Sequence, residues 1–190
     1  MKNIAIFASG EGTNAQNIIN YFKSNAAAIN VVLVVSNNAN AKVLNRAMLL
    51  GLRTIIVDRE MFYNSNKTID ELKFANIDLI VLAGFLWRIP EHLIDSFPNK
   101  IINIHPALLP KFGGKGMYGI NVHKAVIEAK EKESGISIHF VNSEYDEGKL
   151  ISQHKCEISP SDTPEILAQK VHELEIEYFP KAIFNLLIQC

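Results

Sequence analysis

Short runs of β-branched and aliphatic residues alternate along the chain with longer amphipathic stretches. Such runs are typical of buried strands, and the longer stretches of helices that cover a sheet. Strands are expected at residues 4–8, 31–35, 54–57, 79–82 and 101–104. The intervening stretches predict helices from about residue 15, at 41–51, at about 69–75 and at 90–97. This βαβ rhythm predicts a Rossmann-like α/β fold, an open and mostly parallel sheet with helices on both faces.

The pattern changes in the C-terminal part of the chain. Residues 121–133 are typical of a helix, residues 135–141 alternate apolar and polar positions as a strand does, and residues 149–158 form another extended segment. A mixed or antiparallel part is therefore expected to close the sheet. A last helix is expected to begin near Pro164, which suits a first helical position, and to continue towards Leu187. Its expected cap is one of three residues, Ser161, Asp162 or Thr163.

The composition is that of an ordinary globular protein, with 48% hydrophobic and 21% charged residues among 190. This length predicts one domain over residues 1–190. The formal net charge is −1 and the sequence has no basic cluster, so neither nucleic acid nor a membrane is expected as a partner. The N-terminal apolar run is shorter than a signal-peptide core, and two cysteines, Cys156 and Cys190, are too few for a disulfide framework. Both features favour a cytoplasmic location.

The first predicted strand ends in a glycine-rich segment, ASGEGTNAQNII. A glycine turn between a strand and a helix lets the backbone approach an anion, and the free N–H groups at the start of the helix favour a phosphate. Glu11, Gly12, Thr13 and Asn14 are expected to donate backbone amides, with the side chains of Thr13 and Asn14 as further donors. The pattern matches neither G-x-G-x-x-G nor G-x-x-x-x-G-K-[ST], so it does not indicate a dinucleotide or a triphosphate. A tight turn that binds nothing stays an alternative.

Two polar residues interrupt the fifth predicted strand. Asn103 and His105 alternate with isoleucines, so their side chains project from one face just before Pro106 ends the strand. Ligands of open α/β sheets bind at the carboxyl ends of the strands. Because each buried polar group needs a partner, this pair favours a functional site over an ordinary hydrogen-bonded core histidine, which stays the alternative.

A run of acidic residues follows the strand expected at 135–141. Acidic runs in loops are usually solvated, and this is the interpretation we favour for Glu144 and Glu147. Asp146 differs, because Gly148 indicates a tight turn that would hold its carboxylate in a fixed place.

Taken together, the segments ASGEGTN, VLAGF, NIHPALLP, GISIHFV and DEGKLI resemble the folate-dependent formyltransferase family over nearly the whole chain. The resemblance implies transfer of a formyl group from 10-formyltetrahydrofolate to the amine of glycinamide ribonucleotide, in de novo purine biosynthesis. It implies catalytic roles for Asn103, His105 and Asp146. Attack of an amine on a formyl group creates an oxyanion, towards which the Asn103 amide and a protonated His105 would donate. Asp146 would raise the pKa of His105 and could relay the surplus proton of the amine.

The resemblance also implies the residues that bind the two small-molecule partners. The turn at residues 11–14 matches the site of the 5′-phosphate of the ribonucleotide, and Glu175 matches the carboxylate that holds its ribose hydroxyls. The residues that match the folate pocket are Leu82, Leu86, Arg88, Ile89, Ile101 and Val141. The apolar members of this set could equally be plain core.

Two segments depart from the family pattern. In Leu86-Trp87-Arg88-Ile89-Pro90 the arginine is displaced by one position, so that Trp87 is an alternative to Arg88 for contact with the folate tail. The loop at residues 111–123 is longer than usual and rich in glycine, which indicates a mobile flap.

Histidines and cysteines show no metal-ligand spacing, so no metal ion is expected. Alternatives to the implied reaction are another folate-dependent formyltransferase, a hydrolase core, or a catalytically inactive phosphate-binding module. The family members that act on tRNA or hydrolyse the folate carry an additional domain, for which 190 residues leave no room.

Overall fold

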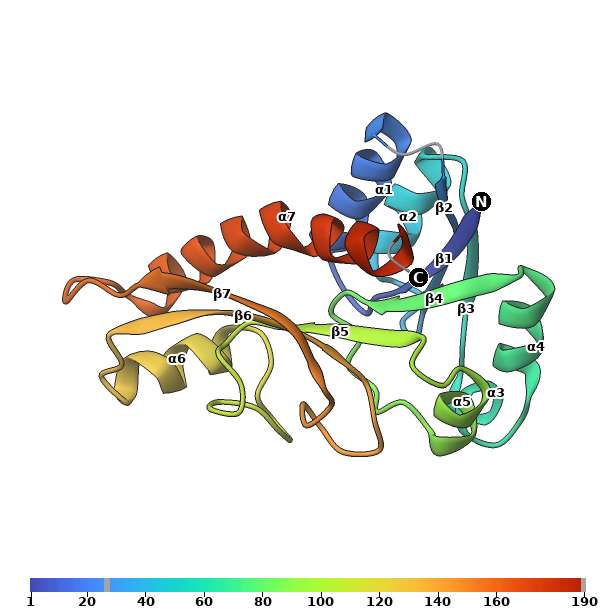
Figure 1. The fold of residues 1–190 in the computed structure, drawn as a ribbon. Helices are drawn as coiled ribbons and strands as arrows, with labels where there is room; N and C mark the ends of the chain where they lie inside the picture. Colours follow the sequence, from blue (N-terminus) through green and yellow to red (C-terminus); the bar gives the residue numbers. More distant parts are fainter. Residues whose placement is uncertain (26–27, 189–190) are drawn as a thin grey trace.

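The computed structural model describes residues 1–25 and 28–188 (Figure 1). In the described residues a seven-stranded sheet has the order β3-β2-β1-β4-β5-β6-β7. The strands are β1 (Lys2–Phe7), β2 (Ile29–Ser36), β3 (Arg53–Ile56), β4 (Ile77–Leu82), β5 (Ile101–His105), β6 (Glu133–Phe140) and β7 (Leu150–Glu157). The first five pair in parallel, whereas β6 and β7 are antiparallel to their neighbours. The predicted α/β fold with a mixed C-terminal part is confirmed.

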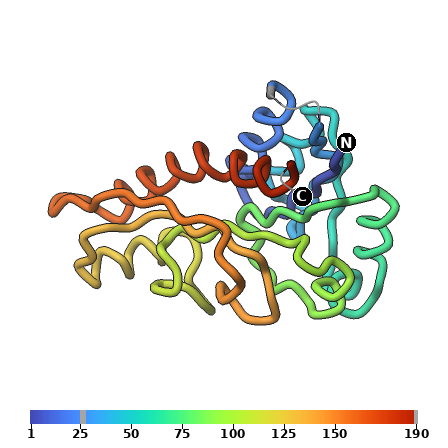
Figure 2. Tube along the Cα trace, in the orientation of Figure 1, coloured from blue at the N-terminus to red at the C-terminus, as the bar shows by residue number. Residues whose placement is uncertain are grey.

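Helices cover both faces of the sheet. One face carries α1 (Thr13–Asn25), α2 (Lys42–Leu49), α6 (Ile120–Glu128) and α7 (Pro164–Ile188), and the other carries α3 (Arg59–Tyr63), α4 (Lys67–Phe74) and α5 (Glu91–Ser96). The Cα trace in Figure 2 shows α7, in red, crossing from the end of the molecule that holds β6 and β7 towards the N-terminal strands. As predicted, Pro164 opens this helix, and the hydroxyl of Thr163 caps it by accepting from the N–H of Ile166 at 3.3 Å.

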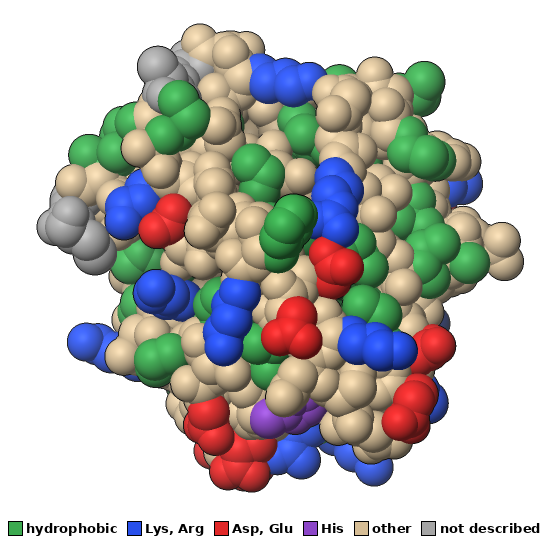
Figure 3. All heavy atoms as spheres, turned by 90° about the vertical axis from the view of Figure 1, so that its right-hand side faces the viewer, with side chains coloured by type: hydrophobic (Ala, Val, Ile, Leu, Met, Phe, Trp, Pro, Cys, Tyr) green, Lys and Arg blue, Asp and Glu red, His purple; other side chains and the backbone are tan. Residues whose placement is uncertain are grey.

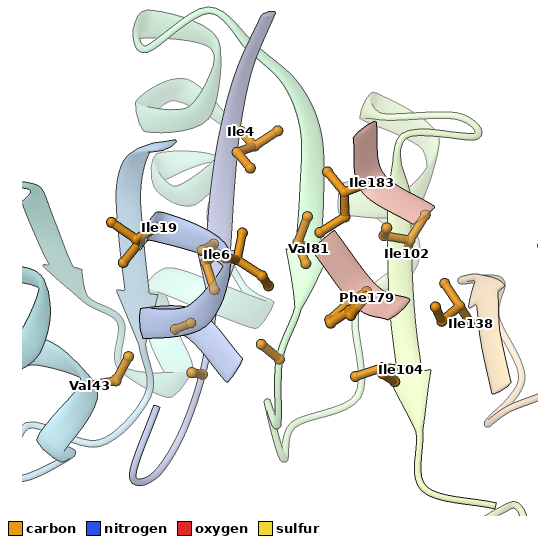
Figure 4. Packing of buried hydrophobic residues seen from close by; sticks show 14 of the residues in the cluster. Ile4, Ile6, Ile19, Val43, Val81, Ile102, Ile104, Ile138, Phe179 and Ile183 are labelled. Atoms are coloured by element: carbon orange, nitrogen blue, oxygen red, sulfur yellow. The ribbon is translucent and has the colours of Figure 1, made fainter. Parts of the chain in front are cut away.

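The alternation of side chains along the strands divides the core into two clusters. Ile4 and Ile6 of β1 point to the face that carries α1 and α7, and Ala5 and Phe7, which alternate with them, point to the face that carries α3, α4 and α5. Figure 4 shows the first cluster, in which Phe179 and Ile183 of α7 lie beside Ile102 of β5. The same alternation leaves the two polar residues of β5 together on the opposite face.

Two helices differ from the sequence prediction. The helix expected at 121–133 is wrong beyond Glu128, because Lys130 adopts a left-handed backbone (φ 54°) and β6 begins at Glu133. The short helix α3, capped by the side chain of Asp58, was not expected, since five residues are too few to show a helical period. Neither difference moves a candidate site residue.

Charged groups of both signs are interspersed on the face of the molecule shown in Figure 3. None of the helices in the described part of the chain is long and apolar enough to cross a membrane. Cys156 is a half-buried free thiol, and Cys190 lies outside the described residues.

Candidate active site

The turn after β1 is fastened to two other strand ends through Ser9. The backbone N–H of Ser9 donates to the carbonyl of Gly84 at 3.0 Å. Its hydroxyl donates to Oδ1 of Asn37 at 2.6 Å and accepts from the N–H of Leu86 at 2.9 Å. The loops that follow β1, β2 and β4 are therefore held as one unit at the carboxyl edge of the sheet.

Gly12 is required by the close approach of α2 to this turn. Its φ is 74°, and a Cβ added there would lie 2.5 Å from Cβ of Val43. The carbonyl of Gly12 accepts the first helical bond of α1, from the N–H of Gln16 at 2.9 Å. The N–H groups of the first turn of α1 have no helical partner, as at any helix start, so this turn is suited to an anion. Glu11 is exposed and pairs with Lys42 at 2.8 Å.

Asn14 joins the expected phosphate turn to the expected ribose residue. Its Nδ2 donates to Oε2 of Glu175 at 2.8 Å, across 161 residues of sequence, and Nδ1 of His172 contacts the same oxygen at 3.0 Å. The hydrogen bond with Glu175 raises the pKa of His172. Among the described residues, Oδ1 of Asn14 is buried without a hydrogen-bond partner. The side chain that we expected to face a phosphate thus gives one of its two N–H donors to Glu175.

The loop at residues 141–149 places Asp146 against the end of β5. Asp146 has a left-handed backbone (φ 57°), and a Cβ at Gly148 would overlap the carbonyl oxygen of Phe140, so this turn needs a glycine. Oδ2 of Asp146 accepts from the backbone N–H of Gly114 at 2.9 Å. The carboxylate therefore has a fixed place, as the glycine pattern indicated.

Asn103, His105 and Asp146 come together as predicted. Nδ1 of His105 lies 3.5 Å from Oδ2 of Asp146, and Nδ2 of Asn103 lies 3.5 Å from Oδ1. His139, which is paired with Asn103 in the β5–β6 register, completes the group. Its Nε2 lies 3.2 Å from Nδ2 of Asn103 and 3.6 Å from Oδ1 of Asp146.

The hydrogen bonds define which ring nitrogens carry protons, because a backbone carbonyl only accepts. Nδ1 of His139 lies 2.8 Å from the carbonyl of Phe140 and therefore carries a proton. Nε2 of His105 lies 2.7 Å from the carbonyl of Phe112 and carries a proton as well. Nδ1 of His105, which faces Asp146, is then the nitrogen that gains or loses a proton.

Burial sets the charge of His105. The side chain is 3% exposed, and desolvation lowers its pKa below the ordinary value of 6.5, although Asp146 and the Phe112 carbonyl raise it by smaller amounts. Asp146 raises the pKa of His105 as expected, but the larger effect of burial lowers it overall, so the expectation of a protonated His105 is wrong for the resting site. Burial by itself raises the pKa of Asp146, but His139, His105 and the Gly114 N–H together lower it. A neutral imidazole thus lies beside an ionised carboxylate.

Two cavities meet at this group. The first, of about 270 Å³, is lined by Asp146, His139 and five of the six predicted folate residues: Leu82, Leu86, Arg88, Ile89 and Val141. The sixth, Ile101, is 1% exposed and lies in the core with Leu93 and Phe97, because it occupies a central strand between two covered faces. The second cavity, of about 610 Å³, is lined by residues 11–14, His105 and Glu175. Asn103 and Tyr118 line both cavities.

Trp87 and Arg88 both line the first cavity, with different neighbours. The guanidinium of Arg88 donates to the carbonyl of Ser143, through Nε at 3.0 Å, and lies 5.8 Å from the ring centre of Tyr145. It therefore braces the loop that carries Asp146. Trp87 packs in an aromatic cluster, with the guanidinium of Arg59 5.2 Å above its ring.

The cavity residues that were not predicted include His139, His172, Tyr118 and His123. His139 had a usable signal, because the alternation of β6 places it beside Asn103 of the neighbouring strand. His172 stands three residues before Glu175, a spacing that brings side chains together on a helix. Tyr118 and His123 had no signal, since they reach the second cavity through the path of the loop and the packing of α6.

In the parts of the chain that the structure describes, no group of three or more histidine, cysteine, aspartate or glutamate side chains is arranged to hold a metal ion.

Known proteins are similar to this chain in fold and in sequence. Residues 2–183 match the family described as formyl transferase. The chain is 40% identical, over 93% of its length, to the chloroplastic phosphoribosylglycinamide formyltransferase of Arabidopsis thaliana, of which it spans 63%. It is 34% identical to the Bacillus subtilis phosphoribosylglycinamide formyltransferase, covering 98% of this chain and 95% of that protein. A crystal structure of phosphoribosylglycinamide formyltransferase from Bacillus halodurans superposes with a TM-score of 0.89 at 33% identity, covering 98% and 96% of the two chains.

Proposed function

The chain belongs to the formyl transferase family, and from this premise we propose that it has phosphoribosylglycinamide formyltransferase activity. The protein would transfer a formyl group from 10-formyltetrahydrofolate to the amine of glycinamide ribonucleotide, a step of de novo purine biosynthesis. The observation that carries the proposal is the position of Asn103, His105 and Asp146 where two cavities meet. A group-transfer enzyme needs a donor site and an acceptor site on either side of its reacting groups.

The two substrates are assigned to the two cavities by their chemistry. The first cavity has an apolar wall of Leu82, Leu86, Ile89 and Val141, which suits the flat rings of the folate donor. The second cavity begins at the amide-rich start of α1 and extends past Glu175, which suits a phosphate followed by ribose hydroxyls. The formyl carbon and the amine then meet beside Asn103.

The transfer forms one carbon–nitrogen bond and breaks another. The amine nitrogen attacks the formyl carbon, the carbonyl oxygen becomes an oxyanion, and the bond between this carbon and N10 of the folate then breaks. The Asn103 amide and the Nε2–H of His105 are the donors that stabilise the oxyanion. The proton lost by the amine is transferred to the departing nitrogen, and the ionised Asp146 relays it through water.

The hydrogen bonds of His105 suit this chemistry. Nε2 of His105 carries a proton even when the ring is neutral, so the ring can donate without a charge in the resting site. Its donor is occupied by the Phe112 carbonyl, which the oxyanion would replace. The ionised Asp146 beside Nδ1 stabilises a positive imidazole, so the ring can hold the amine proton before that proton passes to N10 of the folate.

The test is an assay of purified protein that follows tetrahydrofolate release and formylation of the ribonucleotide together. Tetrahydrofolate release that requires glycinamide ribonucleotide is the expected result, unchanged by a metal chelator. Release of formate without an acceptor would favour a hydrolase, and binding of both substrates without turnover would favour an inactive module. Activity that is lost on chelation and restored by a metal would contradict the metal-free reaction.

Two further expectations belong to this proposal. Residues 1–190 form one formyl transferase domain, which is supported by the family match over residues 2–183. The location is cytoplasmic, although the Arabidopsis relative is named chloroplastic. Fractionation of cells that express the protein at its natural level checks the location.

A further inference from the structure

His123 is a buried histidine in the wall of the second cavity, and the proposed reaction does not use it. Its side chain is 5% exposed, and its Nδ1 is buried without a hydrogen-bond partner among the described residues. Burial lowers its pKa, while Glu175 raises it and His105 lowers it by smaller amounts. The ring is therefore neutral near pH 7 and offers one donor and one acceptor.

The cavity places His123 along the path of the ribonucleotide. His123, Glu175 and His105 all line the second cavity, and each of the other two influences the charge of His123. With the phosphate at the start of α1 and the ribose at Glu175, the reactive amine lies towards His105. The part of glycinamide ribonucleotide between its ribose and its amine is an amide, which has one N–H donor and one carbonyl acceptor.

We infer that His123 hydrogen-bonds to this amide and so directs the amine towards Asn103 and His105. The inference rests on the proposed function. A neutral amide and a neutral imidazole match each other as donor and acceptor, without the desolvation cost of a buried charge. Nδ1 is enclosed in this structure, so the contact requires a turn of the ring towards the cavity, and pairing this nitrogen would then remove the cost of a buried unpaired polar atom.

The experiment separates the amide from the rest of the substrate by using ribose 5-phosphate, which has the phosphate and ribose but no amide. His123→Leu removes the ring, and His123→Asn keeps a polar atom near the position of Nδ1. His123→Leu is expected to raise the KM for glycinamide ribonucleotide about tenfold and to leave inhibition by ribose 5-phosphate and the KM for the folate unchanged. His123→Asn is expected to restore most of the loss.

Glu175→Gln is the contrasting variant, because it acts on the ribose side. This variant should weaken the binding of glycinamide ribonucleotide and the binding of ribose 5-phosphate by the same factor. If His123→Leu also weakens the binding of both ligands equally, or changes the binding of neither, the inference is overturned. If the wild-type protein does not formylate glycinamide ribonucleotide at all, the proposed function fails first, and the two failures are therefore distinct.

A measurement on the wild-type protein covers the case in which His123→Leu does not fold. The ring nitrogens of ¹⁵N-labelled histidines are followed by NMR, with His123 assigned from the His123→Asn spectrum. Glycinamide ribonucleotide should shift the His123 signals, whereas saturating ribose 5-phosphate should leave them in place. Equal shifts with both ligands, or no shift with either, contradict the contact.

Discussion

The two cavities that meet at Asn103 differ in how their buried polar groups are paired. In the first cavity, Asp146 accepts from a backbone N–H of the glycine-rich loop, and Asn103 and His139 hydrogen-bond to each other. In the second cavity, Oδ1 of Asn14 and Nδ1 of His123 are buried without partners among the described residues. The protein pairs the polar groups around the proposed reaction centre, whereas among the described residues it leaves two buried polar atoms unpaired beside the proposed ribonucleotide site.

This difference has a physical reason. Groups that stabilise a transition state act best when they are held in place before the reaction, since their reorganisation would add to the barrier. Groups that recognise a ligand need free donors and acceptors, and the penalty of a buried unpaired group makes them discriminate against a ligand that cannot pair with it. The first arrangement predicts large and coupled losses of rate on mutation, and the second predicts moderate losses of affinity.

The largest effect is expected from the pair His105 and Asp146. Asp146→Asn keeps the shape of the side chain and removes its charge, so kcat/KM should fall by about two to four powers of ten. His105→Ala should cost a similar factor, and the double variant little more than either, because residues that act as one unit are not additive. A double-mutant cycle on kcat/KM measures the coupling.

Glu147→Gln is the matched control for Asp146→Asn, since it removes a charge from the next residue of the same loop, where the side chain is exposed. It should leave kcat/KM within about twofold. Independent losses that multiply in the double variant would contradict the coupled mechanism. So would an Asp146→Asn protein that keeps the wild-type rate.

Gly12→Ala tests the turn that opens the second cavity. The new Cβ would lie 2.5 Å from Cβ of Val43 and would require a left-handed backbone at φ 74°. The free energy of unfolding should fall by about 1–3 kcal/mol, and the KM for the ribonucleotide should rise. Gly10→Ala is the matched control, because a Cβ there meets no atom within 4 Å. Denaturant melts of both variants are compared, and equal stabilities would show that the close approach of α2 does not constrain the turn.

Glu175→Gln is expected to raise the KM for glycinamide ribonucleotide about tenfold and to leave the KM for the folate unchanged, because the carboxylate contacts only the second cavity. Steady-state kinetics with each substrate varied in turn measure the two constants. Glu173→Gln, an exposed position two residues earlier on α7, is the control. An equal rise for both substrates would place Glu175 outside a dedicated ribose site.

Inorganic phosphate is expected to inhibit weakly by competing with glycinamide ribonucleotide and not with the folate. The reason is that the start of α1 opens only into the second cavity, through Gly12, Thr13 and Asn14. Inhibition patterns at several concentrations of each substrate distinguish the two modes. Competition against the folate alone would contradict the assignment of the 5′-phosphate to the start of α1.

The smallest effect is expected in the pH dependence of stability. The folded-state pKa values of His105 and His123 lie below the ordinary value of 6.5, so below pH 6.5 these two residues bind more protons in the unfolded chain than in the folded one, whereas His172, with a raised pKa, acts in the opposite direction. The free energy of unfolding should therefore fall as the pH decreases from 6.5 towards the folded-state pKa values. Urea melts between pH 5 and pH 8 measure the slope, and His105→Gln should reduce it. A flat profile for the wild type would mean that burial does not lower these pKa values.

The pattern of apolar and polar positions was enough to predict the strands, the faces of the sheet and the side-by-side placement of Asn103 and His105. It could do so because a strand repeats every two residues, which makes the direction of each side chain a local property. The position of Gly148 also indicated that the carboxylate of Asp146 is held in place. Resemblance to a family supplied what periodicity could not, the joint roles of these three residues and the identity of the substrates.

Only the tertiary structure decided how these residues are paired and charged. The bond from Asn14 to Glu175 joins residues 161 positions apart, and the contacts of Phe112 with His105 and of Gly114 with Asp146 depend on the path of a long loop. The same structure placed Ile101 in the core and lowered the pKa of His105 despite its carboxylate neighbour. Burial and long-range hydrogen bonds depend on every element that packs around a group, and no local repeat in the sequence records them.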